Sequence, residues 1–136
     1  MSVLVDTNVW SVVLRRKKQL DSEVTSTLRK LITLNQAILI GPIRQELLTG
    51  FKEIHQFEQL QRQLRNFDNY PITVSDYEKA ARYHTVCRQN GIQGSTVDLL
   101  LCAVADNNQL EIFTLDKDFE LYQRHIPIKL YPYKTA

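Results

Sequence analysis

Short apolar segments of strand type alternate with longer amphipathic segments along this chain, and no other sequence feature limits the fold as much. Residues 3–6, 37–40, 111–114 and 128–131 are short and rich in Val, Ile and Leu, and residues 71–74 form a weaker example. Strands that alternate with helices favour a parallel sheet covered by helices on both faces. We therefore predict an α/β fold, a three-layer α/β/α sandwich whose mainly parallel sheet has four to five strands.

Helix signals occupy the segments between these strands. Gly41-Pro42 opens one helix and Gly50 ends it, because proline suits the first turn and glycine the end. Residues 75–78 have the pattern of a capping box. Residues 96–105 are apolar almost all round, which predicts a central helix. The inner face of the helix that begins at the capping box would consist of Tyr77, Ala80, Ala81, His84 and Cys87. The other helices are expected at residues 9–14, from Asp21 or Ser22 to Asn35, and at 54–69 and 118–124.

The bulk properties of the chain fit one soluble domain over residues 1–136. Hydrophobic residues make up 43% and charged residues 24%, and there is no internal repeat or linker-like tract. No apolar run approaches the roughly 18 residues that a membrane span needs, and the first residues lack the features of a signal peptide. Cys87 and Cys102 both lie in apolar helical patterns, which indicates reduced core thiols. We expect a cytoplasmic protein without a membrane partner.

Four carboxylates stand at positions that are unusual for surface charges. Asp6 ends the first strand, and Asp116 follows the strand that ends at Thr114. Ligand sites of parallel sheets lie at this carboxyl edge. Asp98 is surrounded by apolar residues in its helix, where burial of an ionised carboxylate is costly. Glu46 lies at the border of the apolar stripe of its helix.

Each carboxylate also has a structural alternative. Asp98 could help to cap its helix together with Ser95 or Thr96, and Glu46 could be an exposed residue paired with a base. Asp6 could close its strand with a turn, and Asp116 could be an N-cap. Four such coincidences are less plausible than one acidic cluster.

An acidic cluster would need a cation. Two carboxylates about 5 Å apart repel by roughly 3 kcal/mol at an effective dielectric near 20. The cluster must therefore bind a cation or keep some groups protonated. Oxygen ligands without His or Cys favour Mg²⁺ or Mn²⁺. Hydrolysis of phosphodiesters uses such clusters naturally.

The order of these motifs resembles the PIN-domain family. The resemblance rests on four motifs: Val5-Asp6-Thr7-Asn8-Val9, Glu46 before Leu47-Leu48, Asp98 before residues 99–103, and residues 114–119. The set looks most like the VapC-type toxins of bacterial toxin–antitoxin pairs. The resemblance implies a Mg²⁺- or Mn²⁺-dependent endoribonuclease that acts on a structured RNA such as tRNA or rRNA and is blocked by a cognate antitoxin. It also implies metal binding and catalysis by Asp6, Glu46, Asp98 and Asp116, an auxiliary Asp118, and supporting roles for Thr7, Asn8 and Thr114.

Other residues could contact RNA or a protein partner. The net charge is only +2, so candidates for phosphate contact are local: Arg15, Arg16, Lys17, Lys18 and Arg44. The basic run could equally be a solvated helix end, and Arg44 could pair with Glu46. Tyr131 and Tyr133 could stack on bases, although core packing is the stronger interpretation. Residues 9–14 offer much apolar surface, which hints at a homodimer or an antitoxin groove.

Two other functions compete with the nuclease. A phosphatase with Asp6 as its nucleophile would want a carboxylate two residues later, where this chain has Asn8. A non-catalytic RNA- or protein-binding module could use the same fold, but an intact acidic set argues against it. His84 and Cys87 lack a second pair of ligands, so zinc is not expected.

Overall fold

The computed structural model describes residues 1–14 and 22–133. Its central sheet has three parallel strands in the order β2-β1-β3: β1 (Val3–Val5), β2 (Ala37–Ile38) and β3 (Glu111–Phe113). Leu4 of β1 lies opposite Ile38 on one side and Ile112 on the other. All three residues of β1 are buried although their side chains alternate between the two faces. Both faces of the sheet are therefore covered.

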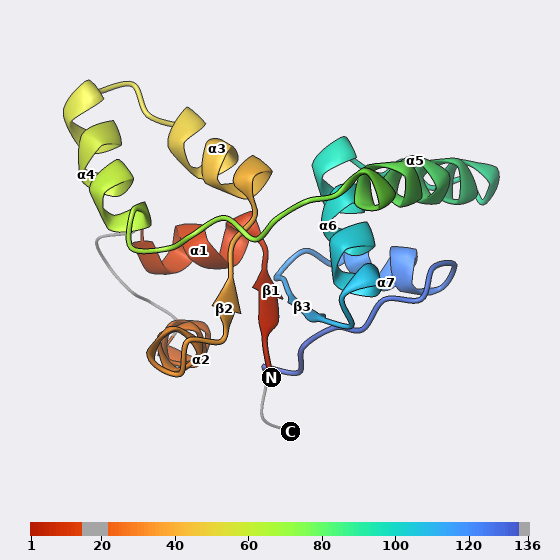
Figure 1. Cartoon of the computed structure of the whole chain (residues 1–136), viewed down its shortest axis with the longest axis horizontal. Coiled ribbons are helices and arrows are strands. Elements are labelled where there is room, and N and C mark those ends of the chain that lie inside the picture. Colours follow the sequence, from red (N-terminus) through yellow and green to blue (C-terminus); the bar gives the residue numbers. More distant parts are fainter. Residues whose placement is uncertain (15–21, 134–136) are drawn as a thin grey trace.

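Helices fill the connections between the strands (Figure 1). In that view α1 to α4 gather on the side of β2, and α5 to α7 on the side of β3. The closest helix pairs are α5 with α6 and α1 with α2. The helices are α1 (Thr7–Leu14), α2 (Ser22–Thr33), α3 (Gly41–Thr49), α4 (Ile54–Leu64), α5 (Val74–Gln89), α6 (Thr96–Asn107) and α7 (Asp118–Gln123).

The α/β class and the parallel sheet are confirmed, while the outer strands are shorter than expected. Single parallel bridges, Leu39 with Asn69 and Ile112 with Leu130, extend the sheet on either edge. Residues 128–131 therefore contribute one bridge in place of a strand. The strand predicted at residues 71–74 is wrong. Thr73 is the N-cap of α5 and Val74 is its first residue.

The N-terminus of α5 corrects two details of the sequence analysis. The capping box consists of Thr73 and Asp76, not of residues 75–78: the Thr73 hydroxyl accepts from the Asp76 amide, and the Asp76 carboxylate accepts from the Thr73 amide. The buried face of α5 also differs from the predicted one. Asp76, Tyr83 and Cys87 are buried, whereas Tyr77 is 55% exposed. Ala81 is exposed as well, so the predicted inner face was only partly right.

The apolar surface of α1 is used inside the chain. Val9 and Trp10 are fully buried, and the Trp10 ring meets Phe67 edge-on with 5.0 Å between ring centroids. The Trp10 indole donates to the Val5 carbonyl at 3.1 Å. The predicted partner interface on residues 9–14 is therefore largely core. Cys87 and Cys102 are buried free thiols, as expected. Among the described residues, no helix is long and apolar enough to cross a bilayer.

Candidate active site

Asp6 is the centre of a hydrogen-bond network at the carboxyl edge of the sheet. It directly follows β1 and is only 6% exposed. Its Oδ1 accepts from the Thr7 amide at 2.7 Å, and its Oδ2 accepts from the Thr114 hydroxyl at 2.7 Å. The Asn8 amide group lies 3.4 Å from the same Oδ2 and accepts from the Leu115 amide at 3.1 Å. These contacts tie the end of β1 to the end of β3 and fix the orientation of the Asp6 carboxylate.

Glu46 reaches the same edge from α3. The Thr7 hydroxyl donates to its Oε1 at 2.6 Å, across 39 residues of sequence. Thr7 is the first residue of α1, so this bond joins the start of α1 to α3. Glu46 itself is exposed to solvent, which leaves its carboxylate accessible to a ligand.

Asp98 lies in the first turn of α6 and also takes part in a long-range contact. The N-cap is Ser95, whose hydroxyl accepts from the Asp98 amide at 3.0 Å. The Asp98 carboxylate is turned toward α7, where its Oδ2 accepts from the Tyr122 hydroxyl at 3.0 Å. The capping alternative is thus correct for Ser95, while the side chain of Asp98 is used elsewhere.

Asp116 and Asp118 form the turn that opens α7. The Asp116 amide donates to the Thr114 hydroxyl at 3.0 Å, and the Asp118 amide donates to Asp116 Oδ1 at 2.9 Å. Thr114 thereby contacts both Asp6 and Asp116. Asp118 is exposed. Lys117, which directly precedes α7, has a helical backbone and makes no side-chain cap bond, so Asp116 supplies the hydrogen bond of a cap at the start of α7, as the structural alternative for this residue proposed.

The carboxylates influence one another electrostatically. The pKa of Asp6 is raised to about 6: burial is the main cause, the bonds from Thr114 and Thr7 oppose the rise, and the charges of Asp98 and Glu46 add to it. Burial also raises the pKa of Asp98, with contributions from Asp116 and Glu46. Within residues 1–14 and 22–133, none of the four carboxylates pairs with a basic side chain. The fold thus collects negative charge at one edge without a compensating cation from those ranges.

Comparison with known proteins adds to this geometry. The sequence matches the model of the PIN domain over residues 3–124. The chain belongs to the PIN domain family. A search of curated proteins finds no match.

Solved structures share the fold of this PIN domain at low sequence identity. FitAcB from Neisseria gonorrhoeae is 19% identical, with a TM-score of 0.78 over 96% of this chain and 97% of the other. VapBC2 from Rickettsia felis, bound to a DNA fragment from its promoter, is 17% identical, with a TM-score of 0.76 over 96% and 98%. A toxin–antitoxin complex from Klebsiella pneumoniae is 19% identical, with a TM-score of 0.65 over 85% and 88%.

The donor set of this PIN domain suits a hard divalent cation that keeps much of its water. In the described part of the chain, no three His, Cys, Asp or Glu side chains are placed to hold one ion directly. Mg²⁺ typically uses one or two carboxylates, and waters or substrate phosphates complete its shell. The raised pKa values of Asp6 and Asp98 show that added positive charge would be favourable between them. The residues present therefore fit Mg²⁺ or Mn²⁺ bound by few direct ligands.

Arg44 has a structural role that replaces the predicted phosphate contact. Its guanidinium donates to Asn69 Oδ1 at 2.8 Å, to the Leu64 carbonyl at 2.9 Å, and to the Phe67 carbonyl. These bonds fasten the end of α4 to α3. Arg15, Arg16, Lys17 and Lys18 lie outside the described residues. Tyr131 and Tyr133 pack against Phe113, with ring centroids 5.6 and 5.1 Å apart, so core packing is confirmed for both.

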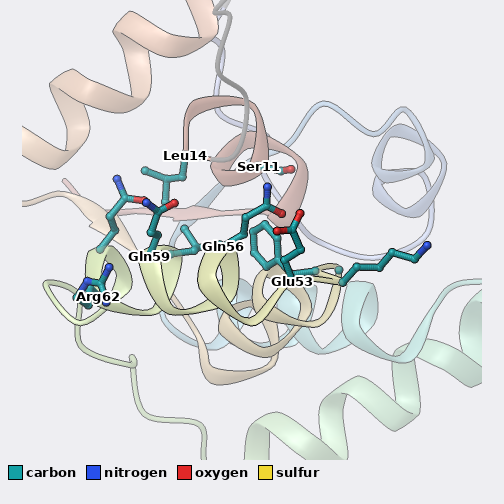
Figure 2. Close-up of a pocket in the computed structure, with 11 residues that line it drawn as sticks. Ser11, Leu14, Glu53, Gln56, Gln59 and Arg62 are labelled. Atoms are coloured by element: carbon teal, nitrogen blue, oxygen red, sulfur yellow. The ribbon is translucent and has the colours of Figure 1, made fainter.

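A broad hollow lies away from the acidic cluster, between α1 and α4 (Figure 2). It has a volume of about 1030 Å³ and none of the four carboxylates lines it. Gln56, Gln59 and Gln63 contribute side-chain amides from α4, and Leu14 contributes an apolar wall from α1. Lys52, Glu53 and Arg62 add charged side chains to the lining.

Sequence reasoning missed Tyr122. Among the residues 118–124 predicted as a helix, Tyr122 was not singled out. A buried tyrosine hydroxyl needs a hydrogen-bond partner, however, and Asp98 supplies it. The need for a partner was a usable signal, but nothing in the sequence indicates that Tyr122 of α7 lies beside Asp98 at the start of α6.

Proposed function

We propose that this PIN domain is a metal-dependent endoribonuclease and the toxin of a toxin–antitoxin pair. The observation that carries the proposal is the convergence of Asp6, Glu46, Asp98 and Asp116 on one sheet edge, where burial and the neighbouring carboxylates raise the pKa values of Asp6 and Asp98 and no basic side chain among the described residues pairs with any of the four. Phosphodiester hydrolysis needs positive charge where negative charge grows in the transition state.

Mg²⁺ or Mn²⁺ would be held chiefly by Asp6 and Asp98, with Glu46 and Asp116 completing the site and Asp118 in an auxiliary position. Such an ion, when bound, eases formation of a nucleophile from water and offsets the charge on the phosphate. The supporting residues keep the carboxylates oriented. Thr114 and Asn8 hold Asp6, and Thr7 holds Glu46. This preorganisation means that little reorientation is needed when RNA binds.

The substrate that we propose is a structured RNA such as tRNA or rRNA in the cytoplasm. Phosphate contacts supply most of the affinity of such binding and depend strongly on salt. The basic run at Arg15, Arg16, Lys17 and Lys18 directly follows α1, which starts beside Asp6. It therefore remains our candidate for phosphate contact in the place of Arg44.

A protein antitoxin is the proposed partner. One of the proteins that share this fold is a toxin–antitoxin complex from Klebsiella pneumoniae. The hollow between α1 and α4 offers apolar walls and glutamine amides to a peptide segment (Figure 2). We therefore place an antitoxin segment in this hollow, from which it could extend along α1 toward Asp6.

A homodimer is also proposed, on a different surface from the one first considered. Tyr77 and Ala81 flank an apolar hollow of about 430 Å³ between α5 and α6, which a second copy would cover. Light scattering after gel filtration should then give twice the chain mass of 15.9 kDa. A chain that elutes at 15.9 kDa at all concentrations would rule the dimer out.

The decisive experiment is cleavage of total RNA with mapping of the new ends. We expect cleavage with Mg²⁺ or Mn²⁺ and none in EDTA. Glu46→Gln should remove cleavage, whereas Asp68→Asn, the loss of one charge at an exposed position outside the cluster, should not. RNA binding without cleavage would favour the non-catalytic module, and a covalent phosphoenzyme would favour the phosphatase. Undiminished cleavage in EDTA would refute the metal-dependent mechanism.

A further inference from the structure

Tyr122 is a buried residue whose hydroxyl points at the acidic cluster. It is 1% exposed and lies on α7, with its ring edge-on to Phe119 at 5.2 Å between centroids. This packing fixes the position of the ring and therefore of its hydroxyl. The hydroxyl donates to Asp98 Oδ2 at 3.0 Å, across 24 residues of sequence.

The contact repeats a pattern that holds for two of the other three carboxylates. Asp6 is held by the hydroxyl of Thr114, and Glu46 by the hydroxyl of Thr7. In each of the three cases the carboxylate and its hydroxyl donor come from different elements of the fold. Each carboxylate also keeps a second oxygen that these hydroxyls do not contact. The hydroxyls orient the three carboxylates without neutralising their charge.

We propose that Tyr122 is a positioning residue, whose hydroxyl fixes the Asp98 carboxylate and thereby sets the affinity of the cluster for a divalent cation. The inference rests on the proposed function. Packing alone would be served equally by phenylalanine, because only the hydroxyl distinguishes the two side chains. Groups that orient metal ligands by hydrogen bonds typically change metal affinity 10- to 100-fold when they are removed.

The chain offers a matched control for this hydroxyl. Tyr83 on α5 is also buried, and its hydroxyl donates to the Asp106 carboxylate, which lies outside the acidic cluster. Tyr83→Phe and Tyr122→Phe therefore remove the same group from the same kind of bond. Only the second change touches a proposed metal ligand.

The test is a titration of the metal-free chain with Mn²⁺. The electron paramagnetic resonance signal of the free ion measures how much Mn²⁺ remains unbound. We expect affinity about 10-fold weaker in Tyr122→Phe and unchanged in Tyr83→Phe. Equal affinity in wild type and Tyr122→Phe, or equal weakening in both variants, would overturn the positioning role. If the wild type bound no Mn²⁺, the proposed function would fail, and this inference with it.

A second measurement does not depend on the folding of a variant. In a crystal structure of the wild type with Mn²⁺, Asp98 Oδ2 should keep its bond to Tyr122 while Oδ1 faces the ion. A Tyr122 hydroxyl turned away from Asp98 in that structure would overturn the proposal.

Discussion

Replacement of Asp6 by asparagine should change how the stability of the metal-free chain depends on pH. The folded pKa of Asp6 is about 6, against an ordinary value of 3.8. The folded state thus holds the proton more tightly than the unfolded state. Stability is therefore greatest below the unfolded pKa and falls as pH rises from about 4 to about 6. The shift of about two units corresponds to about 3 kcal/mol.

The free energy of unfolding can be measured by urea titration in EDTA between pH 4 and pH 7. We expect the difference between wild type and Asp6→Asn to change by about 2 to 3 kcal/mol across this range, in favour of the variant at pH 7. Altered bonds to Thr114 and Thr7 add an offset that does not depend on the titration of Asp6, so the change with pH isolates its charge.

Asp68→Asn, measured in parallel, controls for the loss of one negative charge at an exposed position. A difference between wild type and Asp6→Asn that stays constant from pH 4 to pH 7 would refute the argument from burial and crowding. A difference that moves in favour of the wild type as pH rises would refute it as well.

Three further changes test the roles of neighbouring residues. Arg44→Met should lower the free energy of unfolding by about 2 to 4 kcal/mol in urea titrations, because three acceptors lose their donor. Unchanged stability together with a weaker salt dependence of RNA binding would instead support a phosphate contact. Thr73→Ala should destabilise by about 1 kcal/mol and by more than Ser75→Ala in the same titrations, and the reverse order would contradict the placement of the capping box. Thr7→Val should reduce the rate of RNA cleavage about 10-fold, whereas Thr7→Ser should keep the wild-type rate because its hydroxyl can still donate to Glu46. Full activity of the valine variant would show that this hydrogen bond has no role in cleavage.

The alternation of apolar strands with amphipathic helices was enough to predict the α/β class. Gly41-Pro42 and Gly50 marked the ends of α3 correctly because proline and glycine act through local backbone geometry. The N-terminus of α5 was misplaced by two residues, since Thr73 and Ser75 are both good caps and only tertiary contacts decide between them. Residues 71–74 do not form a strand, because two apolar residues after a proline do not determine whether a segment pairs with a neighbouring strand. Tertiary contacts decide this as well.

The candidate site was predictable where residues follow strands. Asp6 follows β1 and Asp116 follows β3. Because parallel strands place their carboxyl ends at the same edge of the sheet, the sequence predicts that these two residues lie near each other. The long-range partners were not predictable, because they depend on how helices cross. Arg44 contacts carbonyls at the end of α4, and Tyr122 contacts Asp98. Both contacts join residues at least 20 positions apart that carry no common sequence signal.

The central claim is that separate carboxylates form one site that a divalent cation stabilises. The most direct test compares the melting temperature of wild type and Asp98→Asn with and without Mg²⁺. We predict that Mg²⁺ raises the melting temperature of the wild type far more than that of the variant, and that without metal the variant is at least as stable, since it carries less mutual repulsion. A variant that melts well below the wild type without metal, or that gains as much from Mg²⁺, would contradict the account.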